Sequence, residues 1–134
     1  MPKYVTAINC MDGRVQLPVI NWMKEQFSAE YVDMITEPGP NKILLYGSSE
    51  EINRIKEKII ISHERHESKV VAVVGHYDCA GHPISRERKI EKIIHSVDLI
   101  DSWEFDMQVL GLYVNDKWQV EVVKVKHLEK KMST

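Results

Sequence analysis

The sequence predicts an α/β fold with a central, mostly parallel β-sheet, an antiparallel hairpin at one edge, and flanking helices. Three observations lead to this prediction. Short apolar runs alternate with segments of helical periodicity, one run is continuously β-branched, and a turn signal joins the last two runs. The length of 134 residues suits one domain spanning residues 1–134.

The first half of the chain alternates between strand and helix patterns. Tyr4–Asn9 is predicted to form a strand, and Leu17–Phe27 a helix, because apolar residues of the latter recur at spacings of three and four. Tyr31–Thr36 is the second predicted strand, ended by the breaker cluster Glu37–Asn41. The short apolar run Ile43–Tyr46 fits either a helix or a strand.

The second half contains two longer helices and a buried strand. Ser48 or Ser49 is a suitable N-cap for a helix with glutamates in its first turn. Lys69–Gly75 is the β-branched run, which suits a parallel strand covered on both faces. A third long helix is expected over Glu87–Ile100. The residues predicted to line the buried faces of the two helices are Ile52, Ile55, Ile59, Ile90, Ile93, Ile94, Val97 and Ile100.

A hairpin and a polar tail are expected at the end of the chain. Val109–Val114 and Trp118–Val123 are predicted strands, and Asn115–Lys117 between them is a turn signal. The tail over residues 124–134 is polar and basic, which indicates a frayed helix or a mobile end.

Composition and charge exclude several classes of protein. A net charge of −2 gives no electrostatic reason to expect nucleic acid binding, and the apolar runs are too short to span a membrane. The first residues lack the features of a signal peptide, so we expect a cytoplasmic protein. Thiols stay reduced there, so the two cysteines are better explained as ligands or catalysts than as a disulfide.

Two short motifs follow predicted strands, and both cysteines lie in them. The first is Cys10-Met-Asp12-Gly-Arg14 and the second is His76-Tyr-Asp78-Cys79. If the second and third strands lie on opposite sides of the first, both motifs meet at the crevice beyond the carboxyl ends of the first and third strands. Two thiolates and one imidazole are a recognised ligand set for a catalytic zinc with an open fourth position.

A carboxylate and a guanidinium accompany the predicted ligands. Asp12 is two residues from Cys10, so in an extended segment both side chains point the same way. Asp12 could accept a proton from a metal-bound water or orient the resulting hydroxide, and Arg14 would hold it through forked hydrogen bonds. Asp78 is expected to point away from the metal ion.

Other candidate residues are explained more simply by structural roles. His82 could shuttle protons at the pocket mouth, although a solvent-facing loop histidine is the simpler interpretation. His63 and His66 are three residues apart, not the four of the metalloprotease motif, and are expected at a solvated helix end. The residues expected to serve as packing residues are Met11, Trp22 and Trp103.

The two motifs together resemble those of the β-class carbonic anhydrases, which carry Cys-x-Asp-x-Arg after the first strand and His-x-x-Cys after the third. Gly75 and Gly81 also resemble glycines that flank the family's second motif, and the resemblance covers about Tyr4 to Val123. This chain resembles a short member, without the helices that usually precede the first strand. It carries Gly13 where the family often has serine, and Glu37–Asn41 where the family has Asn-Ala-Gly.

The resemblance implies a zinc enzyme that reversibly hydrates carbon dioxide to bicarbonate through a zinc-bound hydroxide. It implies Cys10, His76 and Cys79 as zinc ligands, with Asp12 and Arg14 as the orienting and proton-accepting pair. In an alternative resting state of the family, the aspartate itself binds zinc and displaces the water. The family also implies a homodimer or higher homo-oligomer, with the pocket near the subunit interface.

Three other functions remain open at this stage. The same fold and zinc ion could serve a non-catalytic sensor or assembly module. The same metal site could hydrolyse a related small linear molecule such as carbon disulfide. A thiol redox protein that uses Cys10 and Cys79 as a pair is a third alternative, although the chain has no Cys-x-x-Cys motif.

Overall fold

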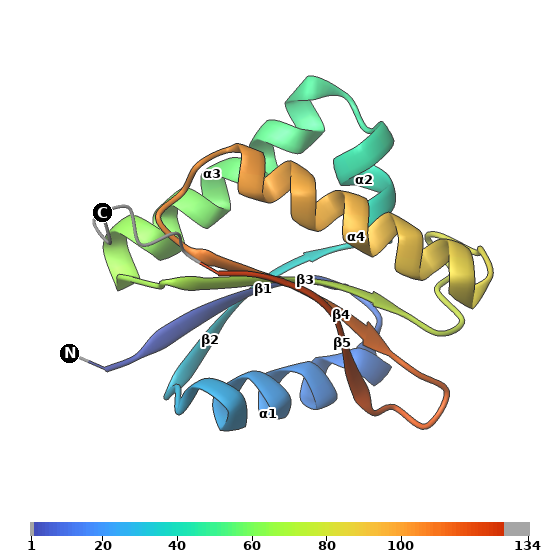
Figure 1. Cartoon of the computed structure of the whole chain (residues 1–134), viewed down its shortest axis with the longest axis horizontal. Helices are drawn as coiled ribbons and strands as arrows, with labels where there is room; N and C mark the ends of the chain where they lie inside the picture. Colours follow the sequence, from blue (N-terminus) through green and yellow to red (C-terminus); the bar gives the residue numbers. More distant parts are fainter. Residues whose placement is uncertain (1, 128–134) are drawn as a thin grey trace.

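A five-stranded sheet with strand order β2-β1-β3-β4-β5 forms the centre of this computed structural model, which describes residues 2–127 (Figure 1). The strands are β1 (Tyr4–Cys10), β2 (Tyr31–Glu37), β3 (Val70–His76), β4 (Gln108–Val114) and β5 (Val120–Lys126). The first four strands pair in parallel, and β5 pairs antiparallel with β4. The predicted α/β fold with an antiparallel edge hairpin is therefore confirmed.

Helices cover both faces of the sheet. The short 3-10 helix η1 (Gly13–Val15) leads into α1 (Gln16–Phe27), which lies on one face, while the other face carries α2 (Pro40–Tyr46), α3 (Ser49–His66) and α4 (Arg86–Ser102) (Figure 1). Alternate strand residues point to opposite faces, so the core forms two apolar clusters, one on each side. β3 is buried at every residue, which explains its continuous β-branched sequence.

The region left open in the sequence analysis, Ile43–Tyr46, belongs to helix α2. Gly39 precedes this helix in a left-handed conformation with φ of 65°, and Pro40 occupies its first turn, where the missing N–H costs no hydrogen bond. The breaker cluster therefore ends β2 and also begins a helix. Ser48 caps α3, and its side chain and that of Glu51 form a reciprocal capping box.

The last strand differs from its predicted bounds. It begins at Val120, because Trp118 adopts a left-handed turn conformation with φ of 57°. It then continues to Lys126, so the expected frayed or mobile tail is wrong for residues 124–126, where Val125 packs on the core. Residues 128–134 of that predicted tail lie outside the described residues.

Two expectations for histidines are refined and one for a methionine needs correction. His63 and His66 lie in the last turn of α3, as predicted, but both are partly buried and have polar partners. His66 Nδ1 lies 2.7 Å from Asp33 Oδ2, and its ring stacks on Tyr4. His63 Nδ1 lies 2.7 Å from the Ser68 carbonyl oxygen. Met11 is 62% exposed and therefore does not pack in the core. By contrast, Trp22 and Trp103 are partly buried against the apolar clusters, as predicted.

The sheet opens at one end between its first and third strands. β1 pairs with β3 only as far as Ile8 and Val73, whereas β1 continues along β2 to Cys10 and β3 continues along β4 to His76. The carboxyl ends of β1 and β3 therefore diverge, which creates the crevice expected where the strand order reverses. Among the described residues, no helix is long and apolar enough to cross a membrane.

Candidate metal centre

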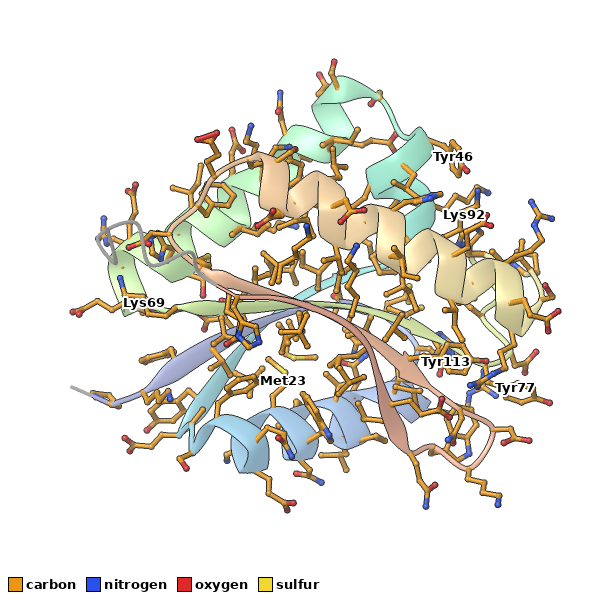
Figure 2. All side chains as sticks on the ribbon, in the orientation of Figure 1. Met23, Tyr46, Lys69, Tyr77, Lys92 and Tyr113 are labelled. Atoms are coloured by element: carbon orange, nitrogen blue, oxygen red, sulfur yellow. The ribbon has the colours of Figure 1, made fainter. Side chains whose placement is uncertain are left out.

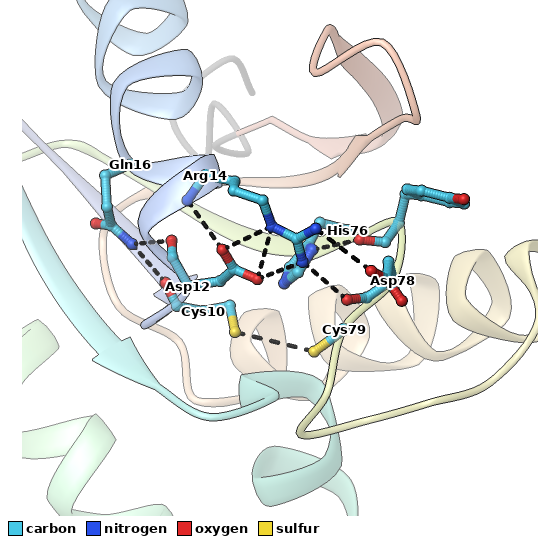
Figure 3. A network of polar contacts seen from close by, with 8 residues as sticks. Cys10, Asp12, Arg14, Gln16, His76, Asp78 and Cys79 are labelled. Atoms are coloured by element: carbon cyan, nitrogen blue, oxygen red, sulfur yellow. Dashed lines mark hydrogen bonds and ion pairs between the residues drawn. The ribbon is translucent and has the colours of Figure 1, made fainter.

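Two sulfur atoms and one imidazole gather in this crevice (Figure 3). The potential ligand atoms of Cys10, His76 and Cys79 all lie within 4.8 Å of one another, and all three residues are buried. The two Sγ atoms are 3.9 Å apart, and both cysteines are free rather than joined in a disulfide. The structure therefore brings together the three residues that the sequence analysis selected as metal ligands.

A tight turn after β3 places Cys79 beside His76. Asp78 adopts a left-handed conformation with φ of 57°, which reverses the chain between the two side chains. The backbone N–H of Tyr77 donates to the Val114 carbonyl oxygen at 2.9 Å, and this bond fixes the start of the turn against β4. The backbone N–H of His82 donates to the Cys79 carbonyl oxygen at 3.2 Å, which closes its far side.

The loops that follow β2 and β3 touch backbone to backbone at two glycines. A Cβ atom on Gly81 would lie 2.7 Å from the Pro38 carbonyl carbon, and one on Gly39 would lie 3.0 Å from the Gly81 carbonyl carbon. No side chain fits between them, so Gly81 is needed for close approach. This contact holds the loop that carries Cys79 against the loop that follows β2.

His76 has the tautomer that a metal ligand needs. Its Nδ1 lies 2.7 Å from the Tyr77 carbonyl oxygen, which can only accept a hydrogen bond, so the ring proton resides on Nδ1. The Nε2 lone pair then has no hydrogen-bond partner within the described part of the chain, although the atom is buried. A metal ion would give this orphaned lone pair its partner, and a backbone acceptor on the other nitrogen is typical of ligating histidines.

The two sulfur atoms share negative charge even without a metal. The hydrogen bond from the Cys79 thiol, together with contacts to His76 and backbone groups, lowers the pKa of Cys10 to about 3 in spite of burial, which acts in the opposite direction. The same pair interaction, together with burial, raises the pKa of Cys79. Cys10 is therefore a thiolate that accepts a hydrogen bond from Cys79, and a soft divalent cation could replace the shared proton.

Asp12 is turned toward Arg14 rather than into the ligand group. The Asp12 carboxylate accepts hydrogen bonds from Arg14 Nη2 at 2.7 Å and from Nε at 3.1 Å, in the predicted forked geometry. It also accepts one from the Arg14 backbone N–H at 2.9 Å. These bonds lower the pKa of Asp12 to about 2, so the carboxylate stays ionised at neutral pH.

Arg14 has a second carboxylate partner that the sequence analysis missed. Its Nη1 lies 3.3 Å from Asp78 Oδ2, and its Nη2 donates to the Asp78 carbonyl oxygen at 3.1 Å. Its guanidinium also lies over the Trp118 ring at 4.8 Å. Asp78 lies outside the ligand group, as predicted, but it links Arg14 to the turn after β3. No sequence pattern signals this contact across 64 positions.

The structure disagrees with both interpretations of His82. This residue is only 6% exposed, so it neither faces solvent nor lies at the pocket mouth. Burial, reinforced by the positive charge of Lys89, lowers the pKa of His82 to about 4. A proton shuttle must gain and lose a proton near the working pH, so a histidine that stays neutral at pH 7 does not suit that role.

A buried lysine lies behind the centre, and it too was missed. Lys89 on α4 is 2% exposed, and its Nζ donates a hydrogen bond to the His82 carbonyl oxygen at 3.0 Å. A sequence signal for its burial exists: Lys89 lies four residues before Ile93, which lies four before Val97, on one helix face.

Comparisons with known proteins agree with the fold. A family model described as "Putative carbonic anhydrase" matches residues 1–124. A carbonic anhydrase structure from Glaciozyma antarctica has a TM-score of 0.56 at 15% identity, covering 89% of this chain and 81% of that one. A tetrameric β-carbonic anhydrase from Sordaria macrospora has a TM-score of 0.59 at 12% identity, covering 94% and 83%. No curated protein sequence matches the chain.

Metal analysis tests the ligand group directly. We expect the purified protein to hold about one zinc ion per chain, and Cys79→Ala or His76→Ala to lose it, because each substitution removes one of only three protein ligands. Inductively coupled plasma mass spectrometry after dialysis measures this occupancy. His95→Ala, at an exposed position on α4, is the control and should retain the metal. Full occupancy in both site variants would contradict the assignment.

The ion pair makes a prediction for acid titration. In the metal-free protein, Asp12 should remain mostly ionised at pH 3, and Arg14→Gln should move its pKa toward the ordinary value of about 3.9. Because the folded-state pKa lies below the unfolded value, the pair stabilises the fold above about pH 4, and this contribution is lost as pH falls toward 2. Carbon-detected NMR of the carboxyl group measures the midpoint.

Arg54→Gln removes a guanidinium from an exposed pair with Glu50 on α3 and serves as the control for this titration. It should leave the Asp12 midpoint in place. An Asp12 midpoint near 3.9 in the unaltered protein would show that the ion pair does not persist in solution.

Proposed function

The chain belongs to the carbonic anhydrase family, as its match over residues 1–124 shows, and we propose on this premise that it is a zinc enzyme that reversibly hydrates carbon dioxide to bicarbonate. The observation that carries the proposal is the buried group of Cys10, His76 and Cys79, in which the His76 Nε2 lone pair has no partner among the described residues. Two thiolates and one imidazole match the chemistry of zinc.

The three side chains would hold zinc with one coordination position open. Zinc held there would lower the pKa of a coordinated water from about 15.7 to near 7, which would supply a nucleophile for carbon dioxide at neutral pH. Cys10 and Cys79 contribute the negative charge that retains the ion. The Tyr77 carbonyl oxygen fixes the His76 ring so that Nε2 faces the sulfur atoms.

Asp12 would orient the nucleophile rather than store its proton. A carboxylate with a pKa of about 2 is a weak base, so it binds a proton poorly at neutral pH but accepts a hydrogen bond well. Arg14 holds the carboxylate in place and is itself held by Asp78. This geometry favours the form in which Asp12 pairs with Arg14 over the one in which Asp12 binds the metal.

Stopped-flow hydration with a pH indicator tests the activity. We expect the zinc-loaded protein to accelerate hydration above the buffer rate, more so as pH rises through the ionisation of the zinc-coordinated water. Asp12→Asn should retain zinc but lose about 10- to 100-fold in rate, because the orienting acceptor is weakened. Asp101→Asn, at an exposed position on α4, is the matched control and should behave like the unaltered protein.

The same sample distinguishes the other functions. Full zinc occupancy without hydration at alkaline pH would favour the non-catalytic sensor or assembly module. Release of hydrogen sulfide from carbon disulfide, without carbon dioxide hydration, would favour the related hydrolase. Absence of metal together with a reversible Cys10–Cys79 disulfide would favour the thiol redox protein.

We also propose that the protein forms a homodimer or higher homo-oligomer in the cytoplasm. Apolar side chains are exposed on the segments that carry the site: Met11 after β1, Leu17 at the start of α1, and Tyr77 after β3 are 62%, 66% and 47% exposed. A second copy could cover them, and the structural neighbour from Sordaria macrospora is tetrameric. Free cysteine thiols such as Cys10 and Cys79 are typical of a reducing compartment.

Analytical ultracentrifugation checks the assembly. We expect a mass at least twice that of the chain, and we expect Leu17→Ser combined with Tyr77→Ser to weaken association because both remove exposed apolar surface. Tyr46→Ser is the control, since Tyr46 is also exposed but lies on α2, away from Tyr77 (Figure 2). A monomer at all concentrations, or equal weakening by the control, would contradict an interface at this edge.

A further inference from the structure

Lys89 is buried directly behind the metal centre and has no part in the roles assigned so far. We propose that Lys89 is a positioning residue: its buried ammonium anchors the turn 79–82 to α4 and supplies a fixed positive charge that favours a small anion at the open metal position. This inference deepens the proposed function and rests on metal binding by the sulfur and imidazole group.

The stem of Lys89 lies on the backbone of β3 next to a ligand. A Cβ atom on Gly75 would lie 2.8 Å from Lys89 Cδ and 2.8 Å from Ile93 Cδ1. Gly75 immediately precedes His76, so the missing side chain at this position makes room for the lysine stem. The glycine therefore lets the Lys89 stem pass close over the end of β3, so that its ammonium reaches the turn that carries Cys79.

The ammonium group is two hydrogen bonds from a metal ligand. Lys89 Nζ donates to the His82 carbonyl oxygen at 3.0 Å, and the His82 backbone N–H donates to the Cys79 carbonyl oxygen at 3.2 Å. The turn that carries Cys79 is thus tied to α4 by a side chain that is itself 2% exposed. Loss of this bond would leave the His82 segment held by backbone contacts alone.

The charge of Lys89 is not balanced by a carboxylate. Within residues 2–127, no Asp or Glu oxygen lies within 4.0 Å of its ammonium. A buried ammonium costs free energy unless an anion compensates it. Burial lowers the pKa of Lys89, and the negative charge of the sulfur pair opposes that effect.

Metal binding changes this balance in a way that favours an anion. The two positive charges of zinc cancel the two thiolates, and the charge of Lys89 is then left without compensation. A hydroxide, bicarbonate or other monovalent anion at the open position would restore neutrality in the buried site. Arg14 does not do the same, because Asp12 and Asp78 both neutralise it.

Anion titration of the cobalt-substituted protein tests the charge. Cobalt(II) replaces zinc in such sites and reports bound thiocyanate by its visible absorption. We expect Lys89→Met, which keeps the stem and removes the charge, to weaken thiocyanate binding on the order of tenfold, because one positive charge near the buried anion is lost at an effective dielectric constant of about 20. Lys89→Gln should weaken it equally, because glutamine is also neutral.

The matched control is Lys92→Met. Lys92 lies three residues further along α4, and its ammonium lies over the Tyr46 ring at 5.2 Å (Figure 2). This variant removes a cation from the same helix and should leave thiocyanate affinity unchanged. Equal thiocyanate affinities in Lys89→Met and the unaltered protein, or an equal loss in the control, would overturn the proposal.

Metal release measures the anchoring role separately. Lys89→Met should release cobalt to a chelator faster than the unaltered protein, and Lys89→Gln less so, because its amide can still donate to the His82 carbonyl oxygen. Equal release rates in all three proteins would overturn this part. Urea unfolding of the metal-free forms verifies folding, and Lys89→Gln carries the test if Lys89→Met does not fold.

These measurements separate this inference from the proposed function, since neither needs turnover. A tenfold loss of thiocyanate affinity in a protein that does not hydrate carbon dioxide would support the role of Lys89 and refute the enzyme. Hydration by the unaltered protein with no thiocyanate effect in either Lys89 variant would refute the role of Lys89 and leave the enzyme proposal standing.

Discussion

The parallel pairing of β1 with β3, and its early end, is the constraint on which the rest of the structure depends. The two strands separate after Ile8 and Val73, because each follows its other neighbour to the sheet edge. Cys10 and His76 occupy the last positions of these diverging strands, so the sheet itself sets the width of the metal centre. Only Cys79 depends on a turn, and two glycines and a lysine hold that turn.

The sequence predicts the fold, and the convergence of Cys10, His76 and Cys79, well because both follow from simple patterns. Apolar periodicity distinguishes helices from strands. The motifs at the ends of β1 and β3 lie side by side because β2 and β3 pair on opposite sides of β1. The sequence predicts poorly whatever depends on contacts between distant segments. The burial of His82 results from loop packing beneath α4, and the link between Arg14 and Asp78 requires the left-handed turn at Asp78. The predicted start of the last strand, Trp118, differs from the observed start, Val120, because the apolar Trp118 adopts a left-handed turn conformation.

The charges around the centre are arranged asymmetrically. On the solvent side, the exposed Arg14 lies between the carboxylates of Asp12 and Asp78, which neutralise its charge. These ion pairs orient Asp12 and join the two motif loops. On the buried side, Lys89 has only sulfur atoms to balance it. In the proposed zinc-bound form, zinc would neutralise those sulfur atoms, so the open metal position would lie in the field of a cation that they no longer balance, and beside a firmly held acceptor. Such a setting suits a reaction in which an anion forms from neutral substrates.

The backbone contact between Gly39 and Gly81 restricts how this protein can evolve. Because neither position has room for a side chain, a substitution at either glycine pushes apart the two loops, one of which carries Cys79. Divergence among related sequences should therefore accumulate in the exposed hairpin turn at Asp116 and Lys117, while both glycines stay unchanged, since a second substitution would add a clash rather than relieve the first.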